Sequence, residues 1–216
     1  MSDLLLTPAE ARVLAVLVEK SILTPQYYPM TANAAMLASN QKTVRNPVMN
    51  LSEGDTGAAL NRLESLRLVT RDSMSGRVQK WRQQMQHQLL LKPAELAVLV
   101  TLVLRGPQTL SELRGNAHPL GGPAEAEAMQ AVLASLQDRA QPLVTELARA
   151  PGQKEARQAH LLCGAPVVPP QPAYAASAAP AAEAGGHEHE DLAARVAALE
   201  ARVAELERVL AALGGA

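Results

Sequence analysis

The sequence predicts a mainly α-helical protein with small β-hairpins, an α+β fold in which one structural module occurs twice. Leu-Thr-Pro-Ala-Glu at residues 6–10 returns as Leu-Lys-Pro-Ala-Glu at residues 91–95, and similar apolar residues follow both. A second similarity links residues 63–66 with 133–136, and a third links residues 68–70 with 143–145. Because a repeat is one structural unit used more than once, both copies should have the same order of elements.

The first copy opens with a strong signal for a helix start. Thr7 suits an N-cap, Pro8 suits the first helical position, and Glu10 completes a Thr-x-x-Glu capping box. Apolar residues then recur at helical spacing. Further helices are expected at 32–39 and, after a second capping box that begins at Ser52, at 52–66. Residues 68–71 and 78–81 read as two strands around a turn at 73–76.

Three helices followed by a two-stranded hairpin is the order of a winged helix, in which helices two and three form a helix-turn-helix and the hairpin is the wing. The second copy predicts helices at 93–104, 109–115 and 123–138, and strands at 143–148 and 156–162. We therefore expect two tandem winged-helix domains, with boundaries at 1–84 and 85–163.

The C-terminal quarter has a different composition. Residues 164–190 are rich in Ala and Pro, which predicts a disordered linker. Residues 191–213 carry a heptad pattern that predicts a coiled-coil helix, with Arg at g and Glu at e suited to pairing of two identical chains. The apolar positions expected to form this homodimer are Leu192, Val196, Leu199, Val203, Leu206, Leu210 and Leu213.

Composition limits the classes of function. The formal net charge is -1, although residues 1–82 hold ten Lys/Arg against seven Asp/Glu. One cysteine, Cys163, fits a reducing cytoplasm, and no segment predicts a signal peptide or a membrane span. No catalytic motif or metal-ligand cluster stands out, so we expect no enzyme activity and no cofactor.

The stretch Thr-Pro-Gln-Tyr-Tyr-Pro-Met-Thr at 24–31, followed by Asn-Gln-Lys at 40–42, resembles the YceH-like family of uncharacterised bacterial proteins. Pro-Val-Met at 47–49 and Gly-Arg-Val at 76–78 strengthen the resemblance, which covers about residues 4–163. It implies a tandem winged-helix fold and a cytoplasmic bacterial protein, without catalytic residues or cofactor. Ser39 stands where members of that family commonly have a cysteine.

Double-stranded DNA is the default partner of a winged helix, and the first copy carries polar and basic side chains on its predicted third helix, wing and neighbouring loop. The candidate DNA-binding residues are Lys42, Arg45, Asn46, Asn61, Arg62, Arg67, Arg71, Arg77, Lys80 and Arg82. The third helix of the second copy is acidic, which favours packing against protein. Two hypotheses stay open: a DNA-binding protein of regulatory type, and an adaptor that grips an unidentified protein and no DNA.

Overall fold

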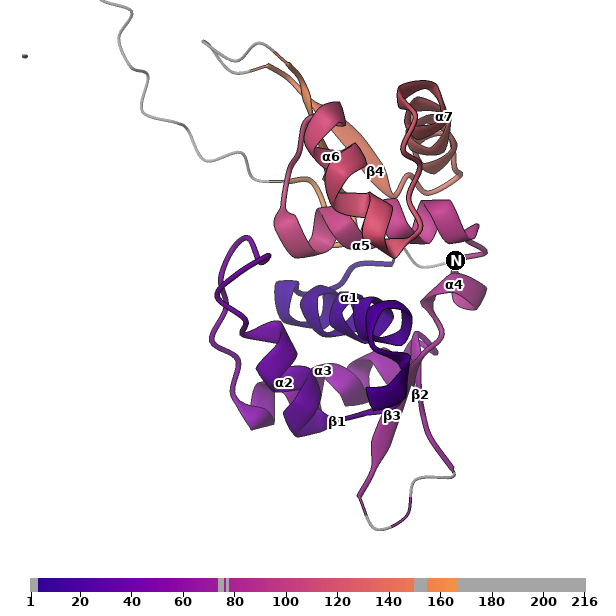
Figure 1. Ribbon diagram of the computed structural model, residues 1–216. Coiled ribbons are helices and arrows are strands. Elements are labelled where there is room, and N and C mark those ends of the chain that lie inside the picture. Colours follow the sequence, from indigo (N-terminus) through magenta and orange to yellow (C-terminus); the bar gives the residue numbers. More distant parts are fainter. Residues whose placement is uncertain (1–3, 74–75, 77, 150–154, 167–216) are drawn as a thin grey trace, which may run out of the picture. The chain divides into compact units, whose positions relative to one another are not determined.

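The computed structural model describes residues 4–73, 76, 78–149 and 155–166 (Figure 1). These residues form a mixed α/β structure that is about half helical and contains two small antiparallel sheets. The expected coil, with all seven of its apolar heptad positions, lies outside the described residues, as does the expected linker beyond residue 166. Among the described helices, none is long and apolar enough to cross a bilayer.

The N-terminal half, residues 4–84, begins with the longest described helix. As predicted, α1 (Pro8–Leu23) starts at a capping box: the Glu10 N–H donates to Thr7 Oγ1 over 3.2 Å, and the Thr7 N–H donates to the Glu10 carboxylate over 2.9 Å. The elements that follow are η1 (Pro25–Tyr27), β1 (Met30–Thr31), α2 (Ala32–Ser39), α3 (Glu53–Ser65), β2 (Val69–Arg71) and β3 (Lys80–Gln83).

The sheet of this half has three strands, in the order β1-β3-β2, where the sequence predicted a two-stranded hairpin. Met30 of β1 pairs with Trp81 of β3. A two-residue strand carries too little alternation to be recognised in a sequence, and it exists here because β3 offers it an edge. The second strand of the hairpin also lies two residues later than predicted, at 80–83.

The C-terminal half, residues 85–166, repeats the order of three helices and an antiparallel strand pair. Its elements are α4 (Met85–Gln88), α5 (Pro93–Arg105), α6 (Leu110–Ala117), η2 (His118–Leu120), α7 (Ala126–Gln137), β4 (Val144–Leu147) and β5 (Arg157–His160). The short segments α4 and η2 were not predicted. The three longer helices and the strand pair were, within about three residues at each end.

The first helices of the two halves pack against each other. In α1 every residue from Ala11 to Glu19 is buried, and in α5 every residue from Glu95 to Leu104. A helix that is buried all round has neighbours on every side. Each of α1 and α5 packs with one side against the other elements of its own half and with the opposite side against the other of these two helices. A single hydrophobic core therefore includes residues of both halves.

Backbone hydrogen bonds join the two halves at both ends of this contact. The Leu6 N–H donates to the Leu162 carbonyl over 2.8 Å, and the Asn46 N–H donates to the Leu104 carbonyl over 2.8 Å. Asn46 also lies against Gly106, whose φ of 73° is one that side chains rarely adopt. The segment between α2 and α3 thus belongs to the contact between the halves.

A buried ion pair fixes that segment to α1. The Arg45 guanidinium contacts the Glu19 carboxylate through two bonds of 2.6 and 3.0 Å, and it also donates to the Ala38 carbonyl. The side chains are 0% and 7% exposed, respectively. Arg12, also buried, donates to the carbonyls of Ser39 and Pro47.

We predict that Glu19→Gln destabilises the protein by about 3–5 kcal/mol, because it leaves the Arg45 guanidinium buried without a counter-charge. The matched control is Glu64→Gln, which breaks the exposed pair between Glu64 and Arg71 and should cost less than about 1 kcal/mol. Denaturant unfolding followed by circular dichroism measures both. An equal loss in the free energy of unfolding for the two variants would show that the buried ion pair contributes no more to stability than the exposed one.

We also predict that the core couples the two halves. Leu99 of α5 is completely buried, so Leu99→Ala should cost about 2–5 kcal/mol. Trp81, the single tryptophan, lies in the N-terminal half and reports on it by fluorescence. The fluorescence and circular dichroism transitions should both shift to the same lower midpoint, whereas Leu37→Ala at an exposed site of α2 should leave them unchanged. A fluorescence midpoint that stays in place would contradict the coupling.

Candidate nucleic-acid interface

A groove of about 630 Å³ lies on the N-terminal half between the start of α2, one face of α3 and the β2–β3 sheet. Its walls include two of the predicted DNA-binding residues, Asn61 and Arg71, together with Trp81. We call it the N-terminal groove. Helix α3 is oriented by its own capping box and by Leu60 and Leu63, which are completely buried.

Arg71 is held in this groove by three neighbours. Its guanidinium lies 5.1 Å from the centre of the Trp81 ring, a cation–π distance. Its Nη2 is 3.0 Å from a Glu64 carboxylate oxygen and 3.3 Å from Asn61 Oδ1. Trp81 is 6% exposed, so its ring packs into the core, and the Arg71 guanidinium lies over one face of the ring.

Other basic groups lie on α3, just after it, or on β3, outside the groove lining. Arg82 on β3 bonds to Asp72 over 2.8 Å, and its guanidinium lies 5.9 Å from the centre of the Tyr28 ring. Arg62 lies exposed in the last turn of α3, and Arg67 follows the helix with a φ of 59°. These arginines give the C-terminal end of α3 and the sheet beside it a basic character.

The structure divides the ten predicted residues into groups. Six lie on α3, just after it, or on the β2–β3 strands, and Lys42 lies exposed in the segment after α2. Arg77 lies outside the described residues. The six residues on α3, just after it, or on the two strands are Asn61, Arg62, Arg67, Arg71, Lys80 and Arg82.

Arg45 is a correction to the predicted interface, and Asn46 lies apart from the N-terminal groove. The Arg45 side chain is fully buried and bonded to Glu19, so its guanidinium is not available to a phosphate outside the protein. Asn46 is exposed but lies against Gly106 of the C-terminal half. Sequence position suggested a surface loop, and only the tertiary structure shows that the Arg45 side chain of this loop is buried.

The opposite end of α3 is acidic. Asp55 accepts hydrogen bonds from the Ser52 hydroxyl and backbone N–H, which hold the pKa of its carboxyl below its usual value. Glu53 is exposed and forms part of the groove wall. Both carboxylates suit the helix N-terminus but would repel phosphate. A nucleic-acid contact would therefore involve the C-terminal end of α3 and the sheet.

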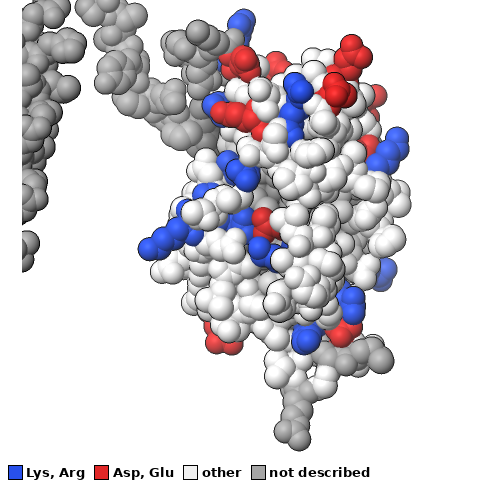
Figure 2. Space-filling model, viewed as in Figure 1, with Lys and Arg blue, Asp and Glu red and all other residues white. Residues whose placement is uncertain are grey.

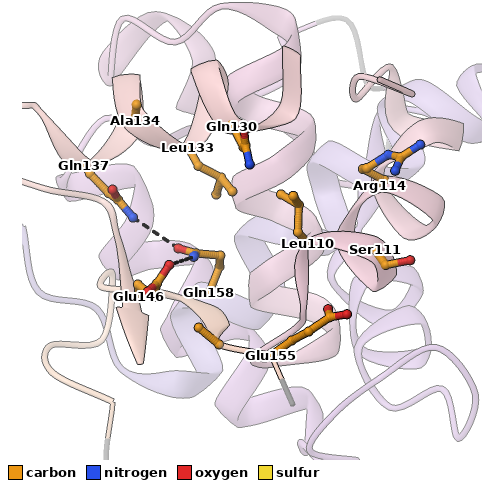
Figure 3. A pocket seen from close by; sticks show the side chains of 11 residues that line it. Leu110, Ser111, Arg114, Gln130, Leu133, Ala134, Gln137, Glu146, Glu155 and Gln158 are labelled. Atoms are coloured by element: carbon orange, nitrogen blue, oxygen red, sulfur yellow. Dashed lines mark hydrogen bonds between the residues drawn. The ribbon is translucent and has the colours of Figure 1, made fainter. Parts of the chain in front are cut away.

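The C-terminal half has a groove at the corresponding place, of about 510 Å³, between α6, α7 and the β4–β5 strands (Figure 3). Gln137, Gln158 and Glu146 form a chain of hydrogen bonds along one wall. The Gln137 amide donates to Gln158 over 3.1 Å, and the Gln158 amide donates to Glu146 over 2.8 Å. We call it the C-terminal groove.

Strand register gives an equivalence between the two grooves. Arg71 pairs across the sheet with Trp81, and Glu146 pairs with Gln158. The repeat aligns Val69-Thr70-Arg71 with Val144-Thr145-Glu146. A cation over an aromatic ring in one copy therefore corresponds to a carboxylate bonded to an amide in the other. The charge at this cross-strand position is therefore opposite in the two grooves.

The surface shows the same contrast. Figure 2 shows acidic side chains gathered over the part of the drawn face that α6, α7 and the β4–β5 strands form. Among the described residues, no group of three or more His, Cys, Asp and Glu side chains is placed to hold a metal ion.

Comparison with known proteins gives relatives along most of the chain. A UPF0502 protein of Geobacter sulfurreducens is 46% identical over 164 residues, which cover 76% of this chain and 75% of the relative. A UPF0502 protein of Azoarcus is 46% identical over 202 residues, covering 93% and 89%. One of Mesorhizobium japonicum is 42% identical over 211 residues, covering 98% and 97%.

Residues 6–153 match the family described as "Protein of unknown function, DUF480", so the match includes α1, α5 and the whole N-terminal groove, and the C-terminal groove except Glu155, Ala156 and Gln158. The chain therefore belongs to the DUF480 family, whose bacterial relatives carry the name UPF0502.

Proposed function

We propose that the protein is a non-enzymatic DNA-binding protein of regulatory type. In this proposal each half is a winged helix, and the N-terminal half binds double-stranded DNA through the C-terminal end of α3 and the β2–β3 wing. The C-terminal half serves protein packing, and residues 191–213 pair two chains. The proposed function involves no cofactor.

The opposite charge at one equivalent position of the two grooves, Arg71 in the first and Glu146 in the second, carries the proposal. Both copies have the same fold order and cross-strand register, so a purely structural role would not require different groove walls. The N-terminal groove has Arg71 stacked on Trp81, and the C-terminal groove has Glu146 bonded to Gln158. At this position a polyanion is attracted by the Arg71 guanidinium and repelled by the Glu146 carboxylate.

Arg71 is already positioned for such a contact. The Trp81 ring and the Asn61 and Glu64 side chains restrict its guanidinium before any partner arrives, so little conformational entropy remains to be lost. Guanidinium groups bind phosphate through two parallel bonds, and free N–H groups remain because the bond to Glu64 occupies one edge. Asn61 lies beside it and offers an amide that suits the edge of an adenine.

A dimer would strengthen binding without further contacts. One basic surface of this size makes few phosphate contacts, so we expect modest affinity from a single chain. Two surfaces joined through the C-terminal coil would bind with a high effective concentration for the second contact. This role of the coil stays a prediction, because its residues lie outside those described.

The test measures binding of the full chain to a mixed-sequence DNA duplex by fluorescence anisotropy at two salt concentrations. The double variant Arg62→Gln/Arg71→Gln should bind about tenfold more weakly at low salt. The slope of log K against log salt should fall by about two units, because two phosphate contacts are lost. The double variant Arg114→Gln/Arg149→Gln makes the same charge change on the C-terminal half and should bind like the wild type. An absence of binding at low salt, or an equal loss in the control, would refute the proposal.

One observation favours the adaptor function instead. Ile22, Leu23 and Tyr27 lie close in sequence at the end of α1 and are 40%, 44% and 76% exposed. Exposed apolar groups that lie together are typical of protein contacts. If the wild type does not bind DNA, and a purified partner binds it but not Tyr27→Ser, the adaptor replaces the DNA-binding proposal.

A further inference from the structure

The contact between the two halves contains a small polar pocket of about 370 Å³. We call it the seam pocket. The N-terminal half contributes Arg45 and Asn46 to its lining, and the C-terminal half contributes Arg105, Glu112, Asn116 and Arg157. We propose that the seam pocket binds the phosphate group of a small molecule, with Arg105 as the main ligand-binding residue.

The first argument is an excess of positive charge. Glu19 bonds to Arg45 over 2.6 Å and to Lys20 over 3.3 Å. The same carboxylate also interacts electrostatically with Arg12 and Arg105. One carboxylate thus interacts with four cations, and Arg45 repels both Arg12 and Arg105. Figure 2 shows acidic atoms bordered by Lys and Arg near the middle of the drawn face.

The second argument concerns Arg105 itself. Within the described part of the chain its guanidinium has no hydrogen-bond or ion-pair partner, although the side chain is half-buried. Burial lowers the pKa of Arg105, and nearby Arg45 lowers it further, against an opposing effect of Glu19. Its position at the end of α5 suits the helix dipole but does not require that it lie beside a second arginine. A cation placed at a cost to stability is typical of a binding site.

The surrounding groups fit a phosphate. Arg105 offers a planar set of N–H donors that matches two phosphate oxygens. The Asn46 amide is held nearby against Gly106, and Asn116 is fixed through a 2.7 Å bond from its amide to Gln108. These amides come from both halves, so a bound phosphate would connect the halves directly.

Glu112 limits the charge that the pocket accepts. Its carboxylate bonds to Arg157 over 2.9 and 3.2 Å and accepts the Thr109 N–H over 3.0 Å. The bond from the Thr109 backbone, followed by the bonds and charge of Arg157, keeps the pKa of Glu112 below its usual value. The fixed negative charge of Glu112 in the wall of the seam pocket disfavours a polyphosphate. The volume of this pocket exceeds that of a bare phosphate ion. A monophosphate ester fits both constraints.

The experiment uses the full chain and three probes: inorganic phosphate, adenosine monophosphate and adenosine. Isothermal titration at constant ionic strength measures the affinities, and Trp81 fluorescence follows the thermal midpoint. We expect saturable binding of phosphate and of the monophosphate, with a rise in the midpoint, and no binding of adenosine. Tighter binding of the monophosphate identifies an esterified ligand, whereas equal affinities identify the free anion.

Two variants with the same charge change locate the site. Arg105→Gln should weaken phosphate binding about tenfold, the usual loss for one charge-assisted contact. Arg149→Gln, at an exposed position of the C-terminal half outside the pocket, should bind as the wild type does. Without ligand, Arg105→Gln should be at least as stable as the wild type, because it removes a cation from a positive cluster.

Three results would overturn the proposal. In the first, phosphate and the monophosphate have no more effect than chloride at equal ionic strength. In the second, both variants lose binding equally, which would mark a diffuse attraction. In the third, unliganded Arg105→Gln is clearly less stable than the wild type, which would make Arg105 a structural residue. No DNA enters these measurements, so they fail or succeed independently of the proposed DNA binding.

Discussion

The packing of α1 against α5 is the constraint on which the rest of the described structure depends. Each helix is buried on all sides, so neither half could withdraw from the other without exposing an apolar face. The segment between α2 and α3 is then fixed in place by the Arg45–Glu19 pair and by the backbone bond from Asn46 to Leu104. Both grooves lie on elements supported by this shared core.

The two copies share apolar residues at many buried positions and differ in their groove walls. The shared apolar residues match because each copy must fill a similar space between three helices and a small sheet. The equivalent cross-strand pair is Arg71 and Trp81 in one groove wall and Glu146 and Gln158 in the other. A repeated fold therefore presents two chemically different surfaces, and each surface calls for its own functional explanation.

The contact between the halves is polar at the seam pocket. Its arginines are stabilised in part by Glu19, and the positive charge that remains is the basis of the proposed anion site. The residues proposed to bind that anion come from both halves. Occupancy of the seam pocket would thus act on the relative stability of the joined halves, since a ligand that binds only the joined state stabilises it.

The sequence by itself determined the elements of the described residues with few exceptions. Capping boxes at Thr7 and Ser52 and the repeated apolar spacing depend on neighbours a few positions apart, so local physics fixes them. Strand β1 was missed because its two residues become a strand only by pairing with β3, fifty residues later.

The candidate site was predictable in part. Asn61, Arg62 and Arg71 were placed correctly on α3 and the sheet, since helix and hairpin order follows from pattern. The tertiary structure alone decided that Arg45 is buried, that Arg71 stacks on Trp81, and that Arg105 has no hydrogen-bond or ion-pair partner among the described residues. Each of these facts depends on contacts between segments far apart in the chain, and no local pattern encodes which charged side chain such packing encloses.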